Sequence, residues 1–173
     1  MIDTREIQIR MVRGERFSVR ELLSWMSSED PDALGAAFQA LYARDSIDGA
    51  VDSQTANQFL VRYLVATMRR ETSSAEMFSM QPYVAAHELA RLYKYWRRAV
   101  PSDDRNLQRV RAELAELYVS GDELTRKVLV DGALEHIFEQ RDCRADFADW
   151  ALNERLRAAF DEALVWGMNH EEA

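Results

Sequence analysis

The chain has 173 residues, of which 47% are hydrophobic and 30% are charged, values typical of a soluble globular protein with a substantial core. Its single cysteine, Cys143, excludes an intramolecular disulfide and a thiolate metal cluster within one chain. The net charge of −8 disfavours nucleic-acid binding, because an acidic protein repels phosphate at long range.

Helical periodicity dominates the sequence and predicts an all-α fold, a single compact domain of six or seven helices spanning residues 1–173. The first segment is ambiguous. Ile7, Ile9 and Met11 alternate with polar residues, so residues 5–12 form either a short strand or a frayed helix. Charges run through this segment, and it lacks the apolar core of a secretory signal.

The next helices are predicted from their caps and apolar faces. Ser18 and Glu21 form the pattern of a capping box, and Asp30-Pro31 combines an N-cap with a proline at the first helical position. The further helices are expected at about residues 53–70, 82–100, 102–121, 122–140 and 153–167, with a short helical turn at 145–152. The tail after Gly167 is expected to be frayed.

The longest apolar stretch runs from Phe59 to Met68. It is interrupted by Arg62 and is too short to span a bilayer. We therefore expect no membrane association and a cytoplasmic location.

No cofactor or metal site is predicted. A di-iron helical bundle needs a glutamate three residues before each ligating histidine, and neither His87 nor His136 has one. His170 lies in the expected tail. Together with the lack of a phosphate-binding or nucleophile motif, this favours a protein that is not an enzyme.

Cys143 is a candidate nucleophile, within an Arg-Asp-Cys-Arg sequence. Arg141 and Arg144 flank it and can lower the pKa of its thiol. No sequence signature places a histidine beside it, so we interpret it as an incidental thiol.

Charge is unevenly distributed along the chain. Residues 53–112 carry ten basic and five acidic side chains, whereas residues 113–173 carry fifteen acidic and six basic ones. Such segregation indicates either pairing between segments or a charged partner. Within the Arg-rich segment 91–111, Tyr93 and Trp96 fall on or beside the apolar face, so we expect them in the core rather than stacked on bases.

The sharpest signal is a set of regularly spaced acids. Asp131, Glu135, Glu139 and Asp142 lie four, four and three residues apart, which makes one stripe on a continuous helix. Like charges at this spacing cost about 0.2–0.5 kcal/mol per pair, so we expect compensation. Either the stripe pairs with the Arg-rich segment 91–111, or it binds a basic patch on another protein. The candidate partner-binding residues are Asp131, Glu135, Glu139, Asp142, Asp146 and Asp149.

Residues 121–166 carry a Gly-Ala-Leu-Glu step at Gly132–Glu135, followed by a short loop and a final helix. This stretch resembles the C-terminal part of small all-helical bacterial immunity-type proteins of contact-dependent or polymorphic toxin systems. The resemblance implies an acidic, tight inhibitor of a cognate toxin, commonly a basic nuclease.

Two functions are therefore expected. The leading one is a non-enzymatic protein-binding module, an acidic inhibitor or immunity-type protein that masks a basic partner such as a toxin. The alternative is a structural or adaptor protein that self-associates through an apolar helix face while its charges pair internally.

Overall fold

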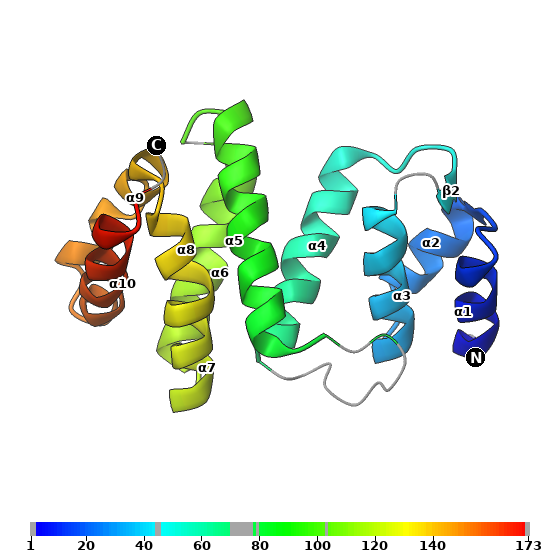
Figure 1. Ribbon diagram of the computed structural model, residues 1–173, viewed down its shortest axis with the longest axis horizontal. Coiled ribbons are helices and arrows are strands. Elements are labelled where there is room, and N and C mark those ends of the chain that lie inside the picture. Colours follow the sequence, from blue (N-terminus) through cyan, green and yellow to red (C-terminus); the bar gives the residue numbers. More distant parts are fainter. Residues whose placement is uncertain (1–2, 44–45, 70–77, 79, 103, 172–173) are drawn as a thin grey trace. The chain divides into compact units, whose positions relative to one another are not determined.

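The computed structural model describes residues 3–43, 46–69, 78, 80–102 and 104–171 (Figure 1). It is 76% helical and 3% strand, which confirms the all-α fold. With the continuous run from Glu123 to Phe138 taken as one helix, the described residues form nine helices rather than six or seven. The two further helices are short ones, at Thr4–Val12 and Arg141–Ala145.

The chain divides into two compact units. Unit 1 comprises residues 1–63 and 71–80, and unit 2 comprises residues 64–70 and 81–173. Helix α4 (Ser53–Met68) contributes residues to both units. The single domain expected from the sequence stays a prediction, and each unit is described by itself.

Unit 1 begins with a helix where a strand was the other alternative. Helix α1 spans Thr4–Val12, and the Asp3 carboxylate caps it by accepting from the amides of Arg5 and Glu6. A strand at residues 5–12 is thus wrong. Ile7 is buried, but Ile9 is 43% exposed, so the alternation does not mark a buried face.

The rest of unit 1 follows its predicted caps. Helices α2 (Val19–Met26) and α3 (Pro31–Tyr42) begin at the capping box and at the Asp30 cap, and both signals are confirmed. Strands β1 (Phe17–Ser18) and β2 (Ile47–Asp48) form a short parallel pair. The unit's core is aromatic-rich and includes Phe17, Trp25, Phe38, Phe59, Tyr63 and Phe78.

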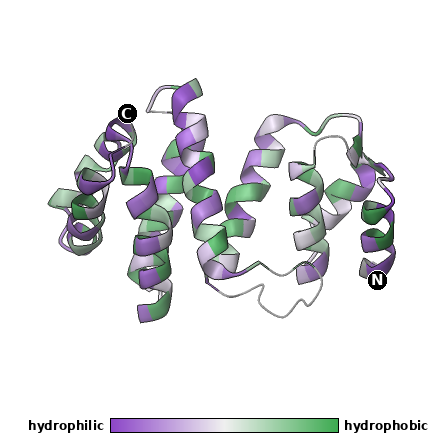
Figure 2. Cartoon of the chain, in the orientation of Figure 1, coloured by the Kyte–Doolittle hydropathy of each residue, from purple (hydrophilic) through white to green (hydrophobic). Residues whose placement is uncertain are grey.

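The regular elements of unit 2 are all helices among its described residues. Its elements are α5 (Pro82–Ala99), α6 (Arg105–Ser120), α7 (Glu123–Leu129), the π-helical segment η2 (Val130–Leu134), α8 (Glu135–Phe138), α9 (Arg141–Ala145), the 3₁₀ segment η3 (Ala148–Leu152) and α10 (Arg157–Asn169). Figure 2 shows hydrophobic and hydrophilic residues interspersed along these helices, as expected for amphipathic packing.

The end of the chain differs from the sequence prediction. Helix α10 continues past Gly167 to Asn169, and Glu171 still makes an ion pair with Arg144. The tail after Gly167 is therefore not frayed as far as residue 171. Residues 172–173 lie outside the described residues.

Two glycines let helices of unit 2 approach closely. A Cβ on Gly132 would lie 2.7 Å from the Cβ of Ala86 on α5, and a Cβ on Gly167 would lie 2.5 Å from the carbonyl oxygen of Phe138 on α8. Both distances are too short for a side chain. These contacts fix where α5 and α10 meet the central helical run from α7 to α8.

None of the described helices is both long and apolar enough to cross a membrane.

Candidate partner-binding surface

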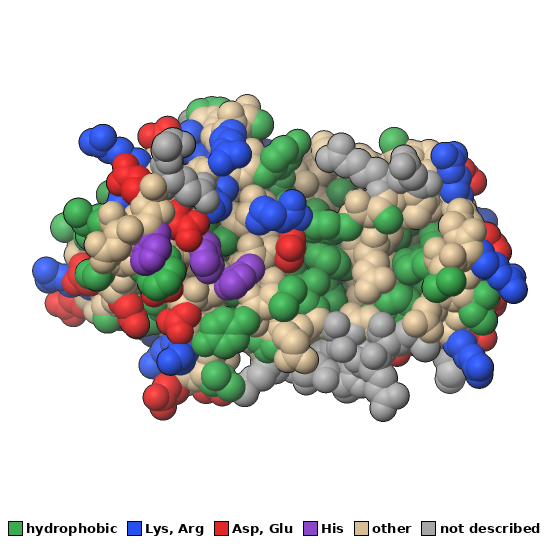
Figure 3. All heavy atoms as spheres, in the orientation of Figure 1, with side chains coloured by type: hydrophobic (Ala, Val, Ile, Leu, Met, Phe, Trp, Pro, Cys, Tyr) green, Lys and Arg blue, Asp and Glu red, His purple; other side chains and the backbone are tan. Residues whose placement is uncertain are grey.

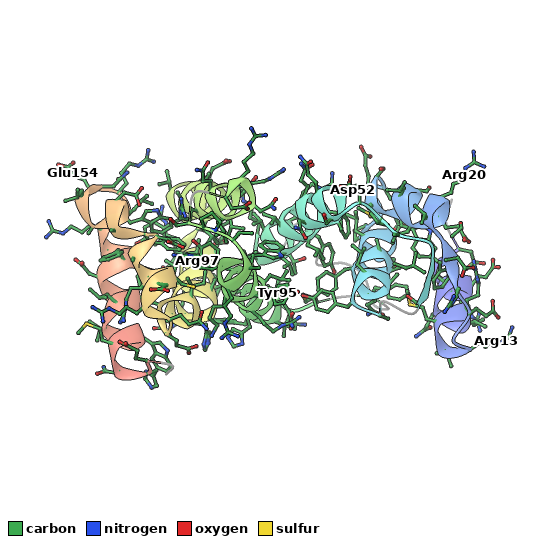
Figure 4. The ribbon with its side chains drawn as sticks, turned by 90° about the horizontal axis from the view of Figure 1, so that it is seen from above. Arg13, Arg20, Asp52, Tyr95, Arg97 and Glu154 are labelled. Atoms are coloured by element: carbon green, nitrogen blue, oxygen red, sulfur yellow. The ribbon has the colours of Figure 1, made fainter. Side chains whose placement is uncertain are left out.

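Two of the six predicted acids form ion pairs with α5. Glu139 lies 2.9 Å from Lys94 Nζ, and the two side chains are 14% and 15% exposed. Asp146 accepts at 2.9 Å from Arg97 Nε and at 3.0 Å from the Tyr93 hydroxyl. The Asp146 side chain is only 3% exposed. Figure 4 shows Arg97 among the helices of unit 2. Both acids are therefore held by the basic segment of the same unit.

The continuous stripe expected from the 4-4-3 spacing does not form. The π-helical segment η2 changes the helical register after Val130, and Gln140 is extended at φ −100° and ψ 123°, which ends the helix at Phe138. Asp142 consequently lies on α9 and Asp149 on η3, and both are exposed. The six acids thus do not share one helix face.

Asp131 and Glu135 remain on the central helical run. The Asp131 carboxylate is 3.5 Å from the Tyr83 hydroxyl and 3.8 Å from Lys127 Nζ. Glu135 is half-buried and, within the described part of the chain, has no ion-pair partner. Burial raises the pKa of Glu135, and the charges of Asp131 and Glu162 raise it further, while His136 and His170 act in the opposite direction.

All three histidines of the chain gather beside these acids. The rings of His87 on α5 and His136 on α8 meet edge to face, with centroids 4.4 Å apart. The His136 ring is 6.5 Å from that of Trp166, and Trp166 stacks on His170 at 3.9 Å. Figure 3 shows the histidines together on one face of the molecule.

The histidine environment is partly desolvated. Burial lowers the pKa of His87, and the charge of His136 lowers it further, while Glu139 acts in the opposite direction. His136 Nδ1 lies 2.7 Å from Glu139 Oε1, which connects the histidine pair to the Lys94–Glu139 ion pair.

We call this region the histidine–acid surface. It crosses α5, the η2–α8 run and α10 and comprises Tyr83, His87, Asp131, Glu135, His136, Glu162, Trp166 and His170. No group of three or more His, Cys, Asp or Glu side chains among the described residues has the arrangement to hold a metal ion.

The sequence does not predict the histidine cluster, because the three histidines lie on or at the end of three different helices. His87 and His136 are 49 residues apart in sequence, and no local pattern joins them. The signal that could have found them is Gly132, which lies one helical turn before His136 and packs on Ala86, the neighbour of His87. The close contact at Gly132 therefore places His87 and His136 side by side on the two neighbouring helices.

The structure also tests the predictions for the aromatic residues of α5 and for Cys143. Tyr93 and Trp96 lie in the core, at 0% and 9% exposure, as predicted. The expected lowering of the Cys143 pKa is wrong, because the thiol is buried. Burial raises its pKa to about 12, with Asp146 adding to the shift.

The chain matches no family model, no curated protein and no solved structure. The likeness of residues 121–166 to immunity-type proteins therefore stays a prediction. What the surface can bind follows from its own side chains. The Asp131 and Glu135 carboxylates can accept hydrogen bonds from a cation, the histidine ring nitrogens can donate or accept hydrogen bonds, and the exposed indole of Trp166 can pack against an apolar group.

Proposed function

We propose that the chain is a non-enzymatic protein-binding module, an acidic inhibitor of the immunity type that masks a basic partner such as a toxin. The partner would bind the histidine–acid surface, and an inhibitor of this kind would act in the bacterial cytoplasm. The observation that carries the proposal is Glu135, a half-buried carboxylate that has like charges at Asp131 and Glu162 and forms no ion pair with an arginine or lysine in the described part of the chain; His136 and His170 offset the repulsion only in part, because its pKa stays raised.

An arginine or lysine from a partner would relieve this repulsion. Complementary charge of this kind speeds association and disfavours wrong partners. Arginine fits best, because its planar guanidinium can bridge two carboxylate oxygens.

Aromatic side chains at the same surface supply apolar contact area. Trp166 is 36% exposed and Tyr83 is 37% exposed. Tryptophan, tyrosine and arginine are the residues that most often dominate the binding energy of an interface. A basic partner could therefore combine charge pairing at Glu135 with packing on Trp166.

Ion pairs within unit 2 reduce the number of acids available to bind a partner. Glu139 and Asp146 are engaged by Lys94 and Arg97, so we assign them to stability rather than to partner binding. Of the six candidate acids, we propose Asp131 and Glu135 as the main charged contacts with the partner. Asp142 and Asp149 are exposed and stay candidates.

The test uses a charge reversal that leaves the Lys94–Glu139 and Arg97–Asp146 pairs intact. The variant Asp131→Lys/Glu135→Lys is compared with wild type in affinity purification from the native host, quantified by mass spectrometry. The matched control, Glu123→Lys/Glu154→Lys, makes the same change in net charge at exposed acids of unit 2 that lie off the surface. Figure 4 shows Glu154 pointing outward.

We expect wild type and control to retain one basic protein that the Asp131/Glu135 variant loses. The association rate of that complex should fall as salt rises, because screening acts on exposed charges. If the Asp131/Glu135 variant folds and retains the same partner with the same rate, the proposal fails.

One observation favours the alternative function, a self-associating structural or adaptor protein. Val165 and Met168 on α10 are each 65% exposed, and Leu152 on η3 is 89% exposed, while two acids pair internally. Light scattering separates the two functions. A homodimer that persists at high salt would favour the adaptor.

A further inference from the structure

A groove lies between α9 and α10, and neither Asp131 nor Glu135 lines it. Its volume is about 450 Å³. Small-molecule sites usually have volumes of about 300–1,000 Å³ and apolar linings with a few polar groups. The groove meets both criteria, since Arg141, Arg144 and Glu171 are its charged lining residues and the others are apolar.

One wall of the groove is an apolar stripe on α10. Phe160, Leu164 and Met168 are four residues apart and therefore share one side of the helix. The neighbouring side, which includes Gly167, packs tightly against Phe138 on α8. The stripe is not fully covered by the described elements, as Met168 is 65% exposed.

The opposite wall presents two arginines. Arg144 Nη2 lies 2.7 Å from the Glu171 carboxylate, and the Arg144 side chain is only 11% exposed. Arg144 Nη1 is buried and has no hydrogen-bond partner among the described residues. Arg141 lines the same groove. The groove therefore combines two positive charges with one negative charge in a protein whose net charge is −8.

We propose that this groove is a binding site for a medium-chain alkyl carboxylate. The carboxylate would replace Glu171 on Arg144, and the alkyl chain would lie along Phe160, Leu164 and Met168. This ligand site goes beyond the proposed masking of a basic partner and does not depend on it.

Arg144 is the group that selects the carboxylate. Glu171 engages only Nη2, and the buried Nη1 donor without an acceptor costs free energy. A carboxylate that displaces Glu171 and is not tethered to the chain would be free to turn towards both nitrogens, in the bidentate geometry that guanidinium groups favour. Arg141 adds long-range attraction for the same head group.

Glu171 acts as a tethered competitor in this site. Arg144 lowers the pKa of Glu171, so the glutamate is ionised under the conditions in which a ligand carboxylate is ionised. A free ligand must displace it, and its apparent affinity is reduced by the fraction of molecules in which Glu171 occupies Arg144. Removing the Glu171 charge should therefore strengthen ligand binding.

The test uses decanoate as the probe, with 1-decanol as its uncharged counterpart. Binding is followed by NMR of the methyl groups of Ala145, Leu164 and Met168 and by calorimetry, below the concentration at which decanoate forms micelles. We expect saturable binding of decanoate with shifts confined to these methyl groups, and clearly weaker binding of 1-decanol.

Three variants of the full chain test the charged groups. Arg144→Gln should weaken decanoate binding by about tenfold, as expected for loss of a charged hydrogen bond. Arg141→Gln should weaken it as well, and this exposed residue is not expected to affect folding. Glu171→Gln should tighten binding by about twofold to fivefold, the factor that an exposed ion pair is worth.

The matched control is Arg157→Gln, which removes an arginine of α10 that does not line the groove. It should leave decanoate binding unchanged. The proposal is overturned if decanoate does not saturate the methyl shifts, if 1-decanol binds equally well, or if Glu171→Gln weakens binding. None of these outcomes concerns Asp131 or Glu135, so failure here leaves the proposed function standing.

Discussion

Arg97 Nε donates a hydrogen bond to Asp146 Oδ2 at 2.9 Å, and the Asp146 side chain is only 3% exposed. This pair links α5 to the residue that ends α9. Tyr93, which is fully buried, donates a second hydrogen bond to the same carboxylate oxygen at 3.0 Å. An acid that the sequence suggested for partner binding thus stabilises the packing of unit 2.

Replacement of Asp146 by alanine should destabilise unit 2 strongly. The change leaves Arg97 without its carboxylate and Tyr93 without its acceptor, and removing one member of a buried pair costs about 3–5 kcal/mol. Since Arg97 is 23% exposed, we expect a value near the lower limit, about 3 kcal/mol. Urea unfolding followed by circular dichroism measures the loss.

Asp142→Ala is the matched control for this prediction, because Asp142 is an exposed acid on the same short helix α9. It should change the free energy of unfolding by less than about 0.5 kcal/mol. Equal effects of the two substitutions would show that the Arg97–Asp146 contact does not stabilise the protein.

Glu135 should have the opposite effect on stability. Burial, followed by the charges of Asp131 and Glu162, raises its folded-state pKa above the ordinary value of 4.5. A group with a raised pKa contributes stability that is fully present below the unfolded pKa and is lost as pH rises through the folded pKa. Ionised Glu135 therefore destabilises the folded chain near neutral pH.

We expect Glu135→Gln to raise the free energy of unfolding by about 0.5 kcal/mol near neutral pH, in line with the cost of like charges one helical turn apart. The gain should disappear below pH 4.5. Glu154→Gln, at an exposed acid, should have little effect at either pH. A Glu135→Gln variant that is less stable at neutral pH would remove the basis for the proposed binding surface.

Gly167 has no space for a side chain. A Cβ at this position would lie 2.5 Å from the Phe138 carbonyl oxygen and 2.7 Å from the Phe138 Cβ. Gly167→Ala should therefore separate α10 from α8 and cost about 1–3 kcal/mol, although alanine is the better helix former. Thermal unfolding monitored by circular dichroism tests this, and an unchanged or raised melting temperature would contradict the close contact.

The features that the sequence predicted correctly are local. The capping box at Ser18 and Glu21, the Asp30 cap and the end of α6 at Gly121 depend on residues within one or two turns of each other. Buried positions such as Tyr93 follow from helical periodicity for the same reason.

The features that were missed depend on contacts between distant segments. The helix break at Gln140 has no proline or glycine beside it, and the single Gly132 within the π-helical segment η2 does not by itself predict a change of helical register. The pairing of Asp146 with Arg97 joins residues 49 positions apart. A spacing of acids along the sequence could not show that tertiary packing divides the stripe in this way.

The capping-box residue Glu21 should make the stability of unit 1 depend on pH in the acidic range. The hydrogen bond from Arg10, at 2.7 Å, is the largest cause that lowers the pKa of Glu21 to about 2, and the Ser18 amide is the next. A depressed pKa contributes stability that is fully present above the ordinary value of 4.5 and is lost as pH falls towards 2. Because the Glu21 side chain is 39% exposed, solvent screening limits this contribution to about 1 kcal/mol.

Carboxyl ¹³C NMR should show Glu21 titrating far below the other glutamates, and Arg10→Gln should return its pKa towards 4.5. Arg20→Gln, at an exposed arginine on the same helix as Glu21, should not. If Glu21 titrates near 4.5 in the wild-type chain, the contact between α1 and α2 does not form in solution as the structure has it.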